Sequence, residues 1–291
     1  MALNVVSGQD IRTRVGHSWI WDLVRKTLTR LTVDEATDGD PLWTPDGNRI
    51  AFFSNRSDEA GEESNSTLWR SDLSRIFLKA ADGTGKDELL GSKGIGFPAS
   101  WSRDGKTLVL TTPNDIVALS MEKGREYKRL LHEKHREAQP RISPDGRWMA
   151  YTSNESGRNE IYVRPFPEVE EGRWQVSTSG GDSPLWSPDS RELFYRNGDV
   201  IITVSVKTDP VFSLGVPKVL FQGNYISYFD KQSIVLEFNP WDVSPDGKRF
   251  LMMKLQRAGD DRSAALEELA PRKIITVTNW FQELKRLVPA P

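Results

Sequence analysis

The sequence predicts an all-β protein: a β-propeller in which six small sheets, mostly of four strands, surround a central channel. Three observations support this prediction. A turn motif recurs along the chain, strand-like apolar segments follow each copy, and the copies are spaced like propeller blades. The composition agrees, because 291 residues with 10% aromatic residues, 22 Gly and 17 Pro can bury a core and form many tight turns.

The recurring motif is a Pro, a short apolar stretch and then Ser/Thr-Pro-Asp-Gly. Ser or Thr opens a tight turn, Pro fixes the next φ, Asp bonds neighbouring N–H groups and Gly accepts a positive φ. Arg103 replaces Pro in the second copy and Ser190 replaces Gly in the fourth. The five copies span residues 41–47, 98–105, 140–146, 184–190 and 240–247. We expect their aspartates to serve the turns rather than form a ring of acids; they are Asp46, Asp104, Asp145, Asp189 and Asp246.

Short β-branched or aromatic segments follow the turns and are predicted to be buried strands. They span residues 50–53, 108–110, 148–151, 193–195 and 249–252. The motif aspartates lie 58, 41, 44 and 57 residues apart. The shorter separations match a blade of about 40–50 residues, so the longer ones predict insertions at 56–67 and 223–237.

The two ends of the chain are expected to close the single propeller domain, residues 1–291. Residues 1–35 are predicted to form a partial first blade without its innermost strand, which suggests a fragment of a longer protein. Residues 273–291 are predicted to form a closing strand and a short helix that begins at Asn279. The exposed edge of the first blade should attract either this C-terminal strand or a second copy of the chain, giving a dimer.

Charge and composition exclude several classes of function. With 39 Lys+Arg against 41 Asp+Glu, the chain has no net positive field to hold a nucleic acid. The absence of cysteine excludes disulfides, thiolate metal sites and thiol nucleophiles. No apolar run reaches the ~18 residues of a membrane span. The chain as written is therefore expected to be soluble and cytoplasmic, or periplasmic or extracellular within a longer parent.

Polar residues just before each motif Pro are expected to lie at one mouth of the channel. The predicted binding residues are Asp40, Gln139, Asp182, Ser183 and Asn239. Three carboxylates among these positions, Asp40, Asp182 and Glu237, have the oxygen ligands that Ca²⁺ prefers. The alternative is that these groups only hydrate a wet channel or cap turns.

The second candidate site lies on the loop before the third copy of the motif. The chain has only three histidines, and His132 and His135 lie close in sequence to Glu137. A proton-transfer role for His135 and Glu137 is one interpretation. A solvated, charged loop is the other.

Three segments show a resemblance to a known family: 19–23 with 27–32, 153–158 running into 162–167, and 279–285. With the turns, they resemble the TolB-like propellers built from Pro-Asp, WD-like repeats, especially those in the C-terminal portion of bacterial serine/threonine protein kinases. The resemblance implies an upstream kinase domain and membrane segment, and a sensing role for the propeller. The chain itself has neither a Gly-rich phosphate loop nor a His-Arg-Asp loop, so it is not a kinase.

Two functions remain open at this point. The first is a module that binds a protein, a peptide or a small molecule at the channel mouth. The second is a metal-assisted hydrolase of esters, lactones or phosphoesters that uses the same mouth.

Overall fold

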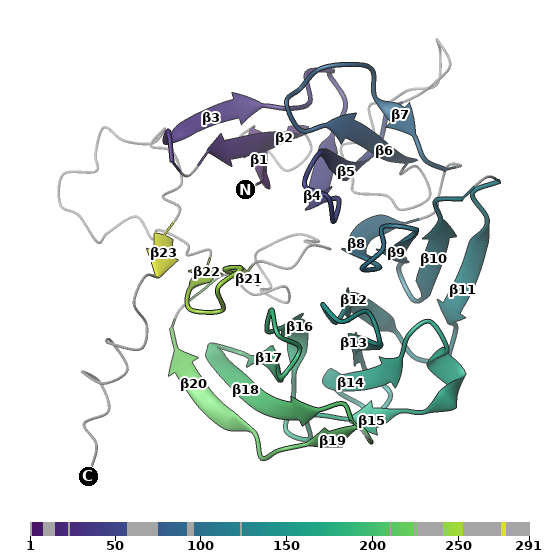
Figure 1. Ribbon diagram of the computed structural model, residues 1–291, viewed down its shortest axis with the longest axis vertical. Helices are drawn as coiled ribbons and strands as arrows, with labels where there is room; N and C mark the ends of the chain where they lie inside the picture. The colour runs from purple at the N-terminus through teal and green to yellow at the C-terminus, as the bar shows by residue number, and fades with distance from the viewer. Residues whose placement is uncertain are drawn as a thin grey trace.

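The computed structural model describes residues 2–7, 15–22, 24–56, 75–91, 96–122, 124–209, 211–223, 225, 241–252 and 275–277. These residues form six antiparallel sheets, which follow one another in chain order around a central axis (Figure 1). The all-β prediction is confirmed. Within the described ranges the sole helical element is a 3-10 turn, Val169–Glu171; the expected C-terminal helix and most of the two expected insertions lie outside them.

The strands of the first three sheets follow the chain from the N-terminus. The first sheet contains β1 (Ala2–Ser7), β2 (Val15–Asp22) and β3 (Thr27–Arg30). The second contains β4 (Asp38–Trp43), β5 (Arg49–Ser54), β6 (Arg75–Ala80) and β7 (Glu88–Leu89). The third contains β8 (Phe97–Trp101), β9 (Thr107–Thr111), β10 (Ile116–Ser120) and β11 (Tyr127–Leu131).

The remaining three sheets complete the circle. The fourth contains β12 (Glu137–Ile142), β13 (Trp148–Ser153), β14 (Glu160–Pro165) and β15 (Trp174–Gln175). The fifth contains β16 (Asp182–Trp186), β17 (Glu192–Asn197) and β18 (Val200–Lys207), with β19 (Ser213–Leu214) and β20 (Lys218–Gln222) both paired to β18. The last contains β21 (Trp241–Val243), β22 (Phe250–Met252) and β23 (Ile275–Val277).

The predicted turns join the first and second strands of each sheet from the second to the last. In the third sheet, Ser102 Oγ donates to Asp104 Oδ1 at 2.6 Å, and the Lys106 N–H donates to the same oxygen at 3.0 Å. The Thr107 N–H donates to Ser102 Oγ at 2.9 Å, and Gly105 has φ of +69°. These hydrogen bonds lower the pKa of Asp104, and the other four motif aspartates also have lowered pKa values. The structural role predicted for these aspartates is confirmed.

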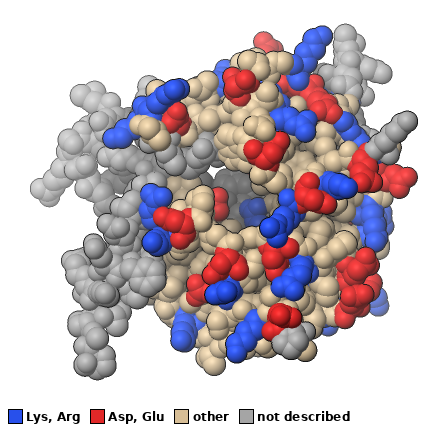
Figure 2. All heavy atoms as spheres, viewed as in Figure 1, with Lys and Arg blue, Asp and Glu red and all other residues tan. Residues whose placement is uncertain are grey.

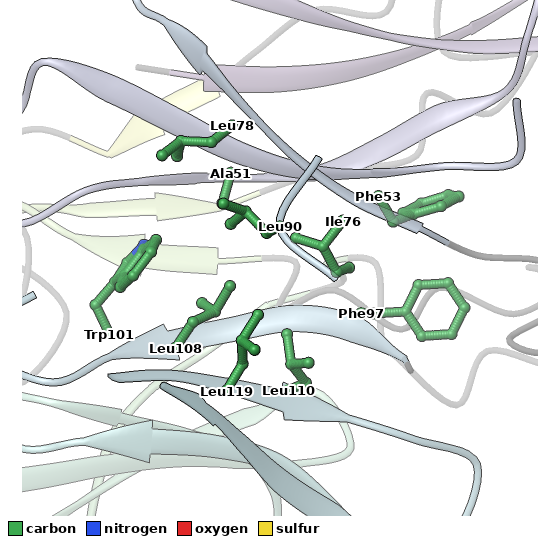
Figure 3. Close-up of a cluster of buried hydrophobic side chains, with 10 residues drawn as sticks. All are labelled: Ala51, Phe53, Ile76, Leu78, Leu90, Phe97, Trp101, Leu108, Leu110 and Leu119. Atoms are coloured by element: carbon green, nitrogen blue, oxygen red, sulfur yellow. The ribbon is translucent and has the colours of Figure 1, made fainter. Parts of the chain in front are cut away.

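The hydrophobic core lies between neighbouring sheets, because the apolar side chains of one sheet pack against those of the next. Figure 3 shows the cluster between the second and third sheets, where side chains from the two sheets meet across the interface. Its members are Ala51, Phe53, Ile76, Leu78 and Leu90 from the second sheet and Phe97, Trp101, Leu108, Leu110 and Leu119 from the third. Similar clusters join the third sheet to the fourth and the fourth to the fifth.

The recurring tryptophans reinforce these interfaces. The Trp186 indole N–H donates to Arg141 O at 2.9 Å, and the Trp241 indole N–H donates to Ser183 O at 3.1 Å. Each bond runs from one inner strand to the inner strand of the preceding sheet. These two tryptophans therefore help to join neighbouring sheets.

The C-terminal strand pairs within its own sheet. In β23, Ile275, Thr276 and Val277 pair with Met252, Leu251 and Phe250 of β22. The expectation that this strand would add to the N-terminal sheet is therefore wrong for the described residues. The physical reason is proximity along the chain, since β22 is the preceding strand and its free edge needs a partner. Dimer formation through the first sheet, which has three described strands, stays a prediction.

Candidate functional site

The inner strands of the second, fourth and fifth sheets begin at the same end of the propeller. They start at Asp38, Glu137 and Asp182, and each is preceded by a loop from the neighbouring sheet. The space-filling view, taken along the same direction as Figure 1, shows a hollow at the centre of the molecule, with basic and acidic atoms on its wall (Figure 2). This hollow lies where the sequence predicts the mouth of a channel.

A bulge recurs near the start of these inner strands. Asp40, Gln139 and Ser183 have φ values of 49°, 56° and 54°, and a proline follows each of them. The pairing register of the strand shifts at the same place in all three sheets. A positive φ at a residue other than glycine is uncommon, and a bulge redirects side chains. The same β-bulge therefore sets the direction of three predicted binding residues, Asp40, Gln139 and Ser183.

Two of these predicted binding residues are bonded to each other. Gln139 Nε2 donates to Ser183 Oγ at 3.1 Å, and Ser183 N–H donates to Gln139 Oε1 at 2.9 Å. Thr152 Oγ1 also donates to Gln139 Oε1 at 2.9 Å, and Ser183 Oγ donates to Asp182 Oδ1 at 2.7 Å. Gln139 and Ser183 are both buried. Their side chains join the fourth sheet to the fifth, and a ligand-binding role for them stays a prediction.

Both described members of the predicted metal set lie near an arginine. Asp182 is paired across the strands with the fully buried Arg196. Burial raises the pKa of Asp182, and the Ser183 hydrogen bond and the Arg196 charge oppose this increase only in part. Arg141 lies near Asp242 and Asp40. Burial lowers the pKa of Arg141, and the charges of these two carboxylates oppose that decrease. An arginine beside a carboxylate competes with a metal ion for it.

A cavity of about 710 Å³ opens between the third and fourth sheets. It lies at the end of the propeller where β12 begins, since three connections form its wall: the β9–β10 loop, the β11–β12 loop and the residue after β13. The lining residues are Thr112, Pro113, Asn114, Asp115, His132, Glu133, Lys134, His135, Arg136 and Asn154. All but the proline carry a polar side chain, so the cavity suits a polar ligand.

Asn154 holds the β11–β12 loop in place. The Arg136 N–H donates to Asn154 Oδ1 at 2.9 Å, and the Asn154 N–H donates to Arg136 O at 3.3 Å. The second sheet repeats this link, because the Thr37 N–H donates to Asn55 Oδ1 at 2.7 Å. The cavity wall is thus built from a repeated element of the fold rather than from an irregular loop.

The structure places His132 and His135 differently within this cavity. His132 Nδ1 lies 2.9 Å from Asp115 Oδ2, and His132 Nε2 lies 3.4 Å from an Arg129 guanidinium nitrogen. Since arginine only donates, the neutral imidazole accepts at Nε2 and donates from Nδ1 to Asp115. Both histidine side chains are exposed, so the difference between them is the pairing of His132 with Asp115. The oriented imidazole is therefore that of His132, whereas the sequence analysis singled out His135 for proton transfer.

Glu137 lies beneath the cavity. Its N–H donates to Asn114 O at 2.9 Å, and it directly follows Arg136; Asn114 and Arg136 line the cavity, and Glu137 lies behind them. The residue is 1% exposed, and Ser153 Oγ donates to Oε1 at 3.4 Å. Burial, together with the charges of Glu133 and Asp115, raises the pKa of Glu137 to about 7. A carboxyl group that titrates near neutral pH can exchange a proton or accept a cation.

Comparison with known proteins supports the fold and not an activity. No protein-family model matches the chain. An uncharacterised peptidase of Bacillus subtilis, YuxL, is 28% identical over 167 residues, which cover 47% of this chain and 25% of the peptidase. An uncharacterised protein of Agrobacterium fabrum is 30% identical over 165 residues, or 53% of each chain. The chain thus spans a quarter of one relative and about half of the other.

Solved structures show the class of protein. A putative TolB from Agrobacterium tumefaciens has a TM-score of 0.57 at 20% identity over 79% of this chain and 80% of that chain. TolB from Acinetobacter baumannii has a TM-score of 0.62 at 19% identity over 88% of this chain and 58% of that chain. The fold is therefore that of the TolB-like β-propellers. The expected kinase context stays a prediction.

A metal site is not assembled by the described residues. An oligogalacturonate lyase solved in complex with manganese has the same fold, with a TM-score of 0.52 at 13% identity over 83% of this chain and 65% of that chain. Among the residues that the structure describes, however, no group of three His, Asp or Glu side chains is placed to hold a metal ion. Glu237 and Asn239 lie outside the described residues. Ca²⁺ binding, and the hydrolase that would need it, stay predictions.

Asp115 and Asn154 were not predicted from the sequence. Asp115 reaches His132 because β10 pairs with β11, where Ile116 lies opposite Leu131. Asn154 joins the same cavity from the neighbouring sheet. One signal was available: the Ser-Asn pair at 153–154 repeats the pair at 54–55. No helix in the described part of the chain is long and apolar enough to cross a membrane.

Proposed function

We propose that the protein is a ligand-binding propeller module that holds a small polar molecule or a peptide segment in the cavity between the third and fourth sheets. The observation that carries this proposal is the cavity itself, about 710 Å³ in volume and lined almost entirely by polar side chains. Its volume lies within the usual range for ligand sites, about 300–1,000 Å³. Its wall is fixed by the Asn154 link, so little ordering is needed on binding.

The test is a titration of ¹⁵N-labelled protein with a defined set of amino acids, blocked dipeptides and small carboxylates. We expect binding compounds to shift the amide signals of Thr112, Asn114, Asp115 and residues 132–136. The substitution His135→Trp places a large side chain in the cavity and should weaken that binding at least tenfold. Lys128→Trp, on the exposed edge strand β11, is the matched control.

Shifts that cluster at the central hollow instead would favour the channel-mouth residues and refute the cavity proposal. Equal binding by wild type and His135→Trp would refute it as well. In either case the predicted residues Asp40 and Asp182 would become the next sites to substitute.

A further inference from the structure

The acid beneath the cavity has a counterpart in another repeat unit. Glu137 and Asp38 each begin an inner strand, β12 and β4. In each case another acidic residue lies four positions earlier in the sequence. In each case, too, the residue paired across the sheet is a serine, at the end of the neighbouring strand, β13 or β5. The equivalent pairs are Glu137 and Asp38, Glu133 and Asp34, and Ser153 and Ser54. The two units therefore present the same acidic site between neighbouring sheets.

In the second sheet, a guanidinium fills this site. One Arg56 nitrogen lies 2.7 Å from Asp34 Oδ2 and 3.4 Å from Asp38 Oδ1. Another lies 2.7 Å from Asp87 Oδ2. The guanidinium carbon is 4.2 Å from the centroid of the Phe77 ring. Three carboxylates and an aromatic face thus surround one planar cation, an arrangement that arginine favours.

In the fourth sheet, the charges that surround this site are exchanged. Glu155 occupies the position of Arg56, one residue after the loop-holding asparagine, and Arg173 occupies the position of Asp87, just before the outer strand. Arg173 and Glu155 pair with each other at 2.6 Å, and the Arg173 guanidinium lies 5.7 Å from the Tyr162 ring centroid. The cation that Arg56 supplies has therefore moved to the outer strand, away from Glu137, and the buried Arg164 of β14 pairs with Glu133 at 3.2 Å.

Glu137 is left without a cationic partner among the described residues. No described Lys, Arg or His nitrogen lies within 4.0 Å of it, and no described group donates to its Oε2. Lys134 and Arg136 line the same cavity, but the Lys134 side chain is exposed and Arg136 Nε donates to Pro113 O at 3.1 Å. A buried carboxylate with no counterion is costly, so the site favours a cation from outside.

We propose that the cavity binds a ligand through an arginine-like guanidinium group, which pairs with Glu137 as Arg56 pairs with Asp38. This inference rests on the proposed function, because it assigns a ligand class to the same cavity. The guanidinium belongs to a free small molecule or to an arginine side chain of a peptide.

The first test uses two probes that differ only in charge, N-acetyl-arginine amide and its neutral isostere N-acetyl-citrulline amide. We expect the arginine probe to bind at least tenfold more tightly in an NMR titration of the cavity amides. Glu137→Gln should abolish that preference, whereas Glu126→Gln, at an exposed glutamate, should keep it. Equal binding of both probes to wild type, or a preference that survives Glu137→Gln, would overturn the inference.

The outcomes separate this inference from the proposed function. If the citrulline probe binds in the cavity as well as the arginine probe does, the cavity is a ligand site and only the guanidinium assignment fails. If no compound of any class shifts the cavity amides, both fail. The tripeptide Gly-Arg-Gly distinguishes the sources: tighter binding than the arginine probe indicates a peptide ligand, and equal or weaker binding indicates a small molecule.

A second test places the missing cation inside the protein. The double variant Glu155→Arg with Arg173→Asp recreates the Arg56–Asp87 arrangement and should occupy the site. We expect the arginine probe to lose at least tenfold in affinity and the ¹³C signal of the Glu137 carboxyl to titrate at lower pH. Wild-type affinity in a folded double variant would overturn the inference.

Discussion

Glu137 makes the stability of the fold depend on pH. In an unfolded chain a glutamate titrates near 4.5, and in the folded protein the pKa of Glu137 rises to about 7. Between these values the folded state binds more protons than the unfolded state, so the free energy of unfolding falls as pH rises. Because one pKa unit corresponds to about 1.36 kcal/mol, the loss attributable to this group is about 3 kcal/mol by pH 8.

Glu137→Gln removes this loss, since glutamine keeps the shape of the side chain but cannot ionise. We expect the variant to match wild type near pH 4.5 and to be more stable by up to about 3 kcal/mol at pH 8. Urea unfolding followed by tryptophan fluorescence at pH 4.5, 6 and 8 measures the difference. Glu126→Gln is the control and should leave the pH dependence as in wild type. The reasoning is refuted if Glu137→Gln and wild type lose stability in parallel between pH 4.5 and 8.

Three further predictions concern the fold. Ser143→Ala removes the turn hydroxyl that donates to Asp145 and accepts from the Trp148 N–H, and should lower the free energy of unfolding by about 1–2 kcal/mol in urea titrations. Leu110→Ala opens a cavity between the second and third sheets and should cost about 2–5 kcal/mol by the same measurement. Gly96→Ala would place a Cβ against the Thr111 carbonyl at a φ of +109°, so the melting temperature should fall; an unchanged value would contradict this close approach of the two backbone segments.

The turns and strands were predictable because their causes are local. The turn residues Ser102, Asp104 and Gly105 lie within four positions of one another, and the equivalent Ser or Thr donates to the equivalent Asp in the other copies. The pattern can therefore be recognised without knowledge of the rest of the chain. The same holds for the strand at 148–151, whose apolar residues follow a turn. A repeat of such units leaves few alternatives to a closed ring of sheets.

The candidate site was only partly predictable because it forms between units. Glu137 was identified from its place before a motif proline, but its raised pKa depends on its burial and on the charges of Glu133 and Asp115. Gln139 was expected at an open mouth, whereas its amide is bonded to Thr152 and Ser183 inside the fold. Such partners depend on how sheets pack, which a pattern within one repeat does not encode.

The tight turns and the cavity lie at opposite ends of the inner strands. In the fourth sheet, β12 runs from the cavity at Glu137 to the turn at Ser143, a distance of about 16–20 Å for a strand of this length. Loops at one end can therefore change their chemistry without disturbing the turns that set the geometry at the other. A fluorescent label or a surface tether attached beside Lys106 would leave the opposite rim free, which makes that side the natural place to anchor the protein in a binding assay.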